Sequence, residues 1–144
     1  MNNTIAVEKV YNTPVEKVWN ALTDKDEMRK WYFNVSDFKP ENGFEFSFAG
    51  QGGKGEEYIH LCKVLDVIPN KKIQYSWAYK NQPGYSIVTF ELFEEGDKTR
   101  LKLTHEGLES FAENGPDFAV TSFNGGWNEI VNVMLEKYLE KAKA

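Results

Sequence analysis

Residues 121–142 read TSFNGGWNEIVNVMLEKYLEKA, and their apolar side chains recur with the period of a helix. A helix of this length extends about 33 Å, and Lys141 and Lys143 suit its C-terminus. Polar residues fill the other faces, so the segment needs an apolar surface to cover. The stripe that predicts this amphipathic helix consists of Phe123, Trp127, Ile130, Val131, Met134, Leu135, Tyr138 and Leu139.

The middle of the chain, from Val35 to Leu103, alternates apolar and polar residues with a period of two, which predicts strands. Breaks that contain Pro, Asn, Gly or Asp separate the runs and predict turns. The run from Tyr58 to Val67 is irregular, so either both of its faces are covered or a bulge shifts its parity. The pattern predicts an antiparallel meander with one apolar face and one wet face. The alternating apolar positions are Phe44, Phe46, Phe48, Ile73, Tyr75, Trp77, Tyr79, Val88, Phe90, Leu92, Leu101 and Leu103.

The N-terminal part predicts a strand over residues 4–11 and then a short helix. Thr13 is expected to cap this helix, with Pro14 at its first position and Glu16 reaching back to the cap. A helix this short is not stable alone, so its apolar stripe must pack on another element. The stripe consists of Val15, Val18, Trp19 and Leu22.

Thr23 and Asp24 offer the cap of a second short helix, which ends at about Trp31. Residues 107–116 are expected to form a loop. Because a twisted sheet curls around a helix more readily than it lies flat, the elements predict an α+β fold, a curved antiparallel sheet wrapped around the long C-terminal helix. The space between them is either filled core or a cavity. We expect one domain over residues 1–144, since no linker is visible.

Composition narrows the classes of function. The net charge is −5 at pH 7, so the basic footprint of a nucleic-acid binder is missing. Cys62, His60 and His105 are too few for a disulfide or for a cysteine- or histidine-based metal centre. No apolar run reaches the length of a membrane span, and no secretory signal precedes the first strand. We therefore expect an acidic cytoplasmic protein with no metal, cofactor, nucleic-acid partner or membrane span.

Seven short motifs, taken in order, carry a family resemblance over essentially the whole chain. They are residues 13–19 (TPVEKVW), 29–31 (RKW), 67–69 (VIP), 73–77 (IQYSW), 88–92 (VTFEL), 99–105 (TRLKLTH) and 125–127 (GGW). With them, the chain resembles the START/Bet v-like (SRPBCC) superfamily and its AHSA-like group, which is related to the C-terminal domain of the heat-shock protein 90 ATPase activator. The resemblance implies a helix-grip fold with a hydrophobic cavity between the sheet and the last helix. The superfamily includes lipid carriers, aromatase/cyclases, hormone receptors and co-chaperones, so the fold alone does not assign a function.

Aromatic residues on the expected inner faces form the candidate site. Core packing explains an aromatic stripe by default, but Tyr and Trp carry polar atoms that need partners when they are buried. Several of these residues around one apolar space suit a pocket with a few polar anchors. The hypothesis is that a ligand cavity is lined by Trp31, Phe46, Tyr75, Trp77, His105, Trp127 and Val131.

His105 continues the inward parity of Leu101 and Leu103. It is either a hydrogen-bonded structural residue or a polar handle that orients a ligand or acts as an acid or base. Residues 50–55 match G-x-G-x-x-G, but a strand follows where a dinucleotide site needs a helix, which favours a flexible hairpin loop. No paired catalytic constellation is recognisable, so no catalytic residue is assigned.

Three functions are compatible with these features. The preferred one is a small domain that binds a hydrophobic or aromatic small molecule, lipids included. The second is a cyclase- or hydratase-type enzyme in which His105 is the acid or base and a tyrosine is the oxyanion donor. The third is implied by the family resemblance and is an interaction protein with a chaperone partner and a role in stress response.

Overall fold

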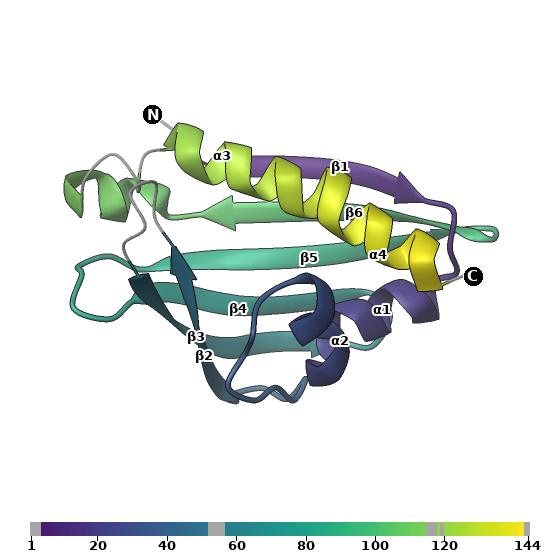
Figure 1. Ribbon diagram of the computed structural model, residues 1–144, viewed down its shortest axis with the longest axis horizontal. Coiled ribbons are helices and arrows are strands. Elements are labelled where there is room, and N and C mark those ends of the chain that lie inside the picture. Colours follow the sequence, from purple (N-terminus) through teal and green to yellow (C-terminus); the bar gives the residue numbers. More distant parts are fainter. Residues whose placement is uncertain (1–3, 52–56, 115–117, 119, 143–144) are drawn as a thin grey trace.

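The described part of the chain, residues 4–51, 57–114, 118 and 120–142 of a computed structural model, forms a six-stranded antiparallel sheet covered by one long helix (Figure 1). The strands lie in the order β1-β6-β5-β4-β3-β2, so the first strand pairs with the last and the meander continues from there to the β2 edge. The strands are β1 Ile5–Tyr11, β2 Glu45–Gln51, β3 Glu57–Ile68, β4 Lys72–Tyr79, β5 Ser86–Glu95 and β6 Lys98–Glu106.

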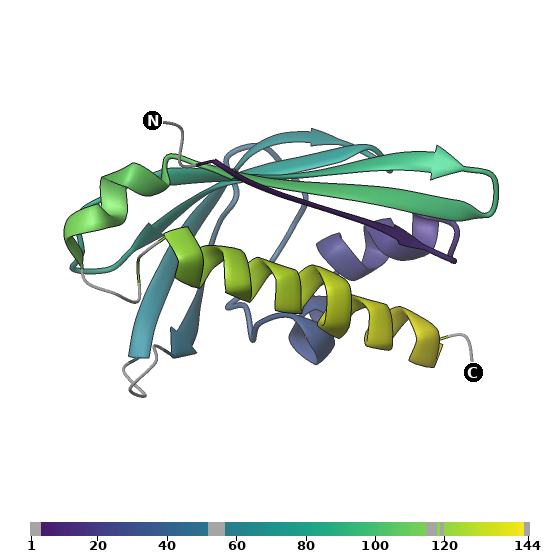
Figure 2. The ribbon, with the colours of Figure 1, turned by 90° about the horizontal axis from the view of Figure 1, so that it is seen from above.

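The helices lie together on one face of the sheet, as the view from above shows (Figure 2). Two short helices, α1 (Val15–Thr23) and α2 (Lys25–Trp31), follow β1. The C-terminal helix, residues 120–142, consists of α3 (Val120–Glu129), a π-helical turn η3 (Ile130–Met134) and α4 (Leu135–Ala142). This arrangement confirms the predicted α+β helix-grip fold.

The sheet has the predicted apolar inner face. Tyr75, Trp77 and Tyr79 of β4 are buried, and of the two residues between them Ser76 is buried as well and Ala78 is half-buried. In β3, the pairing with β4 shifts register between Val64 and Asp66, and Cys62 and Val64 are buried while Leu61 is exposed. A bulge, one of the two alternatives for this run, therefore explains its irregular pattern.

The second short helix is capped as predicted, but the first is not. The Asp24 side chain accepts hydrogen bonds from the backbone N–H groups of Asp26 and Glu27 at 2.9 and 3.2 Å. At α1, the residue in the cap position is Pro14, which makes no side-chain capping bond. The prediction that Thr13 caps this helix is wrong: its buried hydroxyl has no partner among the described residues, and its carbonyl accepts a hydrogen bond from the Thr99 hydroxyl. The segment is thus fixed to β6 rather than to its own helix.

The segment after β6 corrects a second prediction. Residues 108–114, expected to be part of a loop, form a 3₁₀ helix, η1 (Leu108–Asn114). Leu108 and Phe111 are almost fully buried, so this turn carries core residues that a loop assignment overlooks. Most of the glycine-rich stretch 50–55 lies outside the described residues, although Gly50 and Gln51 end β2.

The C-terminal helix confirms the predicted amphipathic segment and adds one irregularity. In the π-helical turn, the N–H of Leu135 bonds to the carbonyl of Ile130. The hydroxyl of Tyr11 donates to the carbonyl of Val131 at 2.6 Å, which ties β1 to the middle of the helix. None of the described helices is long and apolar enough to cross a membrane.

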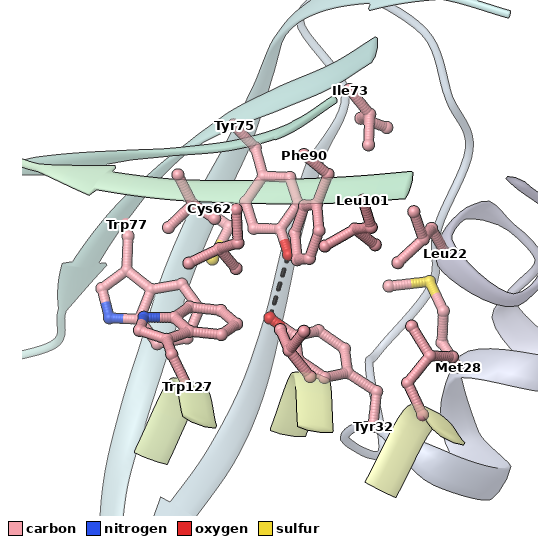
Figure 3. Packing of buried hydrophobic residues seen from close by; sticks show 14 of the residues in the cluster. Leu22, Met28, Tyr32, Cys62, Ile73, Tyr75, Trp77, Phe90, Leu101 and Trp127 are labelled. Atoms are coloured by element: carbon pink, nitrogen blue, oxygen red, sulfur yellow. Dashed lines mark hydrogen bonds between the residues drawn. The ribbon is translucent and has the colours of Figure 1, made fainter. Parts of the chain in front are cut away.

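The core between sheet and helices has two chemically different halves (Figure 3). In the aliphatic half, around α1 and α2, the buried side chains include Leu22, Met28, Ile73 and Leu101. The aromatic half lies toward the start of the C-terminal helix and is built on ring contacts among Trp77, Tyr79, His105, Phe111, Phe123 and Trp127. Tyr32 and Tyr75 meet between the two halves.

Candidate functional site

The seven residues of the candidate site are all buried, and the structure brings part of the set together. The ring centroid of Trp77 lies 5.4 Å from those of both His105 and Trp127. Phe46 contacts Tyr75 edge to face at 5.1 Å. Four of these residues come from strands β2, β4 and β6, and Trp127 comes from α3 and packs on Trp77 and His105 from the helix side.

The contacts that the structure shows for Trp31 and Val131 are to other residues. The indole N–H of Trp31 donates to the carbonyl of Ala21 at 2.8 Å, and its ring lies at the floor of a surface groove between α2 and the C-terminal helix. Val131 is buried in the π-helical turn, where its carbonyl is the acceptor for Tyr11. Trp31 therefore lines this groove, while its buried ring also lies 5.1 Å from that of Tyr32.

His105 is the centre of a closed chain of hydrogen bonds. The indole N–H of Trp127 donates to its Nδ1 at 2.9 Å, and its Nε2 lies 2.8 Å from the Ser86 hydroxyl. Because that hydroxyl donates to the carbonyl of Trp77 at 2.9 Å, Nε2–H must be the donor to Ser86. The imidazole is thus neutral and both of its nitrogen atoms are occupied.

The burial of His105 also keeps its ring uncharged. Its side chain has no exposed surface, and burial lowers its pKa to about 3, since an imidazolium ion would lose its hydration there. A neutral ring with both nitrogens bonded to protein groups has no proton or lone pair left for a ligand. The chain of bonds joins α3 to β4, β5 and β6, which is a structural role.

Tyr32 and Tyr75 form a different kind of contact at the centre of the core (Figure 3). Tyr32 follows α2, Tyr75 points from β4 toward it, and their hydroxyl oxygens are 2.9 Å apart. Each hydroxyl carries one proton, and one hydrogen bond between them uses only one of the two. Neither hydroxyl makes another hydrogen bond within the described residues. One buried phenolic O–H is therefore left without an acceptor among the described residues.

Tyr79 adds a second donor of this type. Its oxygen accepts from the indole N–H of Trp77 at 2.7 Å, and its own proton has no acceptor in the described part of the chain. Burial raises the pKa of Tyr32, Tyr75 and Tyr79, so all three phenols keep their protons at neutral pH. The pKa of the nearby Cys62 thiol is raised by burial as well. This region can donate hydrogen bonds but carries no charge.

A stack of flat side chains closes the β2–β3 side of the aromatic half. The rings of Phe33 and Phe48 are 4.3 Å apart, and those of Phe48 and His60 are 4.4 Å apart, with nearly parallel planes. Gly50 makes room for the stack, because a Cβ atom there would lie 2.7 Å from the His60 ring. Burial lowers the pKa of His60 to about 4, so this ring is also neutral. Among the described residues, no three His, Cys, Asp or Glu side chains group as metal ligands.

Sequence reasoning missed three polar partners in this region. Tyr79 was on the predicted inner face, so its signal was present in the alternation of β4. Tyr32 and Ser86 had no such signal, because one follows a short helix and the other begins a strand. Their importance depends on which residues face them across the core.

Comparisons with known proteins agree with this architecture. A sequence model of the family described as "Activator of Hsp90 ATPase homolog 1-like protein" matches residues 12–140. The structure of protein MLL2253 from Mesorhizobium loti is similar, with 30% identity, a TM-score of 0.77 and coverage of 96% of this chain and 97% of that one. Protein CV1439 from Chromobacterium violaceum has 21% identity, a TM-score of 0.81 and coverage of 96% and 97%.

A further similar structure is DynU16, described as a protein in the dynemicin biosynthetic locus. It has 20% identity and a TM-score of 0.80, and the match covers 99% of this chain but 49% of that one, so the present chain spans about half of DynU16. No curated protein matches the sequence significantly.

Proposed function

Because the chain belongs to the Activator of Hsp90 ATPase homolog 1-like family of the START/Bet v-like superfamily, we propose that it binds an uncharged, largely apolar small molecule between the sheet and the C-terminal helix. The ligand would carry an oxygen atom that accepts a hydrogen bond, and its body would be aromatic or otherwise hydrophobic. Fold and family membership suggest a ligand-binding domain, and the finer statement rests on the chemistry of the core.

The observation that carries the proposal is the phenolic proton of the Tyr32–Tyr75 pair that has no acceptor in the described part of the chain. A buried donor without an acceptor costs about 1–3 kcal/mol, and native cores rarely keep one without a reason. A carbonyl oxygen of a bound molecule would satisfy it. A second acceptor would find the hydroxyl proton of Tyr79.

The surroundings of these hydroxyls favour an apolar ligand. Phe46 and Phe90 contact the Tyr75 ring, and Phe48 contacts Trp77, so the walls are aromatic faces and edges. A charged ligand would lose its hydration here without meeting a buried counter-charge. This excludes carboxylates and amines from the interior and favours ketones, esters, amides and quinones.

Access for a ligand requires the start of the C-terminal helix to move, because Trp127 packs against Trp77 and His105. The residues before it, Gly125 and Gly126, are exposed, and a Cβ atom at either would meet no atom within 4 Å beyond its chain neighbours and its own helix backbone. Sterics therefore do not require glycine there. Each glycine weakens a helix by about 1 kcal/mol relative to alanine, which makes this segment easy to displace.

The occupied nitrogens of His105 favour binding over catalysis. A general acid or base must reach the proton it transfers, and this ring is already bonded on both sides. We therefore propose a binding protein rather than a cyclase or hydratase. Lipids with ester oxygens fall within the proposed ligand class. A chaperone partner and a role in stress response are inferred from the family resemblance alone, and a cytoplasmic location from the composition of the chain.

Two measurements test the proposed function. Native mass spectrometry of the freshly purified protein should detect a co-purified uncharged molecule that is released on denaturation. A thermal-shift panel should show that matched ketones raise the melting temperature more than the corresponding hydrocarbons, because a ligand selective for the native state stabilises it. Equal or absent shifts for both members of every pair would remove the proposal.

A further inference from the structure

A surface groove between α2 and α4 lies outside the core and combines an aromatic floor with positive charge. The view from above shows these two helices beside each other (Figure 2). The groove has a volume of about 520 Å³, within the range of sites that hold one small molecule. Its walls are formed by Lys30, Trp31, Met134, Lys137, Tyr138 and Lys141.

The polar atoms of the floor are already committed to the protein. The Trp31 indole N–H is bonded to the carbonyl of Ala21, and the Tyr138 hydroxyl donates to a carboxylate oxygen of Glu27 at 2.9 Å. Burial and the neighbouring Glu27 raise the pKa of Tyr138 to about 12, so that hydroxyl keeps its proton. A ligand would therefore meet rings and the Met134 thioether on the floor, and ammonium groups at the rim.

The three lysines are available for such a ligand. Lys9, Lys25 and Lys72 form ion pairs with carboxylates, whereas none of the ion pairs found among the described residues involves the groove lysines. Lys137 and Lys141 are four residues apart and share one face of α4, and Lys30 stands across from them on α2. All three are exposed, on a chain whose net charge is −5.

We propose that this groove binds a single anionic amphiphile, such as a fatty carboxylate. Its alkyl or aromatic body would lie on Trp31, Met134 and Tyr138, and its acid group would contact the lysines. The volume suits one free molecule, and the acidic chain as a whole would be repelled by an anionic membrane surface. This site is separate from the interior and does not rest on the function proposed above.

The two described methionines allow a direct test with decanoate, used below the concentration at which it forms micelles. Met134 lines the groove, and Met28 is buried in the aliphatic half of the core. In protein labelled with ¹³C at the methionine methyl groups, decanoate should shift the Met134 signal saturably and leave Met28 unchanged. Uncharged decanol should shift Met134 much less at the same concentration. A response at Met28 instead would place the ligand in the interior and overturn the proposal.

Variants that remove lysine charges test whether the groove lysines contribute to decanoate binding. Lys137→Gln with Lys141→Gln should weaken decanoate binding about fivefold, since exposed ion pairs each contribute little. The matched control, Lys98→Gln with Lys102→Gln on β6, should leave the affinity unchanged. Equal weakening in both pairs, or an unchanged affinity in the groove variant, would overturn the proposal. Lysine-dependent binding to anionic phosphatidylglycerol vesicles without any response to decanoate would overturn it in favour of a membrane surface.

Discussion

Both halves of the core are buried, but they differ in whether their side chains carry polar atoms that need hydrogen-bond partners. In the aliphatic half, Leu22, Ile73 and Leu101 have no polar side-chain atoms, so packing alone satisfies them. In the aromatic half and at its border, every ring with a polar tip needs a partner. Burial alone therefore does not distinguish structural residues from candidate site residues here. The presence or absence of hydrogen-bond partners does.

Within the polar part of the core, the hydrogen bonds distinguish two clusters, one around His105 and one at the Tyr32–Tyr75 pair. In the chain from Trp127 through His105 and Ser86 to the backbone carbonyl of Trp77, every side-chain N–H and O–H has an acceptor. In the Tyr32–Tyr75 pair, one hydroxyl proton has no acceptor within residues 4–51, 57–114, 118 and 120–142. The first cluster holds the helix on the sheet, and the second is the part of the core where a ligand could add a bond.

Acidification should produce the largest difference between the halves, because both buried histidines belong to the aromatic side. Burial lowers the pKa of His60 to about 4 and that of His105 to about 3 in the folded protein. In the unfolded chain, histidines have a pKa of about 6.5 and take up protons below that pH. The contribution of the two neutral histidines to stability is therefore fully present above about pH 6.5 and is lost as the pH falls toward their pKa values in the folded protein. Between about pH 7 and about pH 4.5, the free energy of unfolding should fall by about 5 kcal/mol. Urea denaturation at a series of pH values measures this change in the free energy of unfolding.

The ring signals of the two histidines provide the control. Nuclear magnetic resonance of the folded protein should show neutral imidazole at both positions down to about pH 5. A ring that titrates near its ordinary pKa while the protein stays folded would show that the burial argument does not hold for that residue.

Leu101→Ala tests the aliphatic half. The side chain has no exposed surface, so the variant should lose about 3 kcal/mol of stability through lost burial and a residual cavity. Its preference for ketone over hydrocarbon ligands should not change. Leu61→Ala, at an exposed position of β3, is the matched control and should change stability by less than about 0.5 kcal/mol. A loss of ketone preference in Leu101→Ala would erase the distinction between the halves.

Ser86→Ala and Tyr75→Phe remove one hydroxyl each from the two polar clusters. Ser86→Ala leaves the Nε2–H of His105 without an acceptor and should cost about 2 kcal/mol. Tyr75→Phe removes a member of a pair that is already incompletely satisfied, so it should cost less than about 1 kcal/mol. Denaturation curves of both variants decide the ranking, and the reverse order would contradict the assignment of the spare proton.

The smallest expected effect is a gain. Gly125→Ala and Gly126→Ala should each stabilise the protein by up to about 1 kcal/mol, because neither added methyl group meets a neighbour. If the start of the C-terminal helix must move for a ligand to enter, the double variant should also bind more slowly. Stopped-flow association rates check this, and an unchanged rate would mean that access lies elsewhere.

The periodicity of the sequence was sufficient to predict the strands, the C-terminal helix and the curved α+β architecture. It failed where the structure depends on contacts between distant segments. Thr13 has the chemistry of a cap, but its carbonyl is bonded to Thr99, which is remote in the sequence. Residues 108–114 look polar and irregular, yet Leu108 and Phe111 anchor them in the core.

The site shows the same limit. Alternation placed Tyr75, Trp77 and His105 on the inner face, which the structure bears out as buried positions. It could not find Tyr32, because the value of that residue comes from facing Tyr75 across the core. The groove lysines could not be predicted from the sequence either, since Lys30 and Lys137 line one groove only because the fold brings α2 beside α4.

The most direct test of the central claim compares two ligands that differ only in an acceptor oxygen, acetylnaphthalene and ethylnaphthalene. By calorimetry, the wild-type protein should prefer the ketone about tenfold, equivalent to about 1.4 kcal/mol for one hydrogen bond. Tyr32→Phe combined with Tyr75→Phe should abolish that preference, whereas Tyr85→Phe, at an exposed position, should retain it. A preference that survives in the double variant, or that is absent in the wild type, would contradict the account.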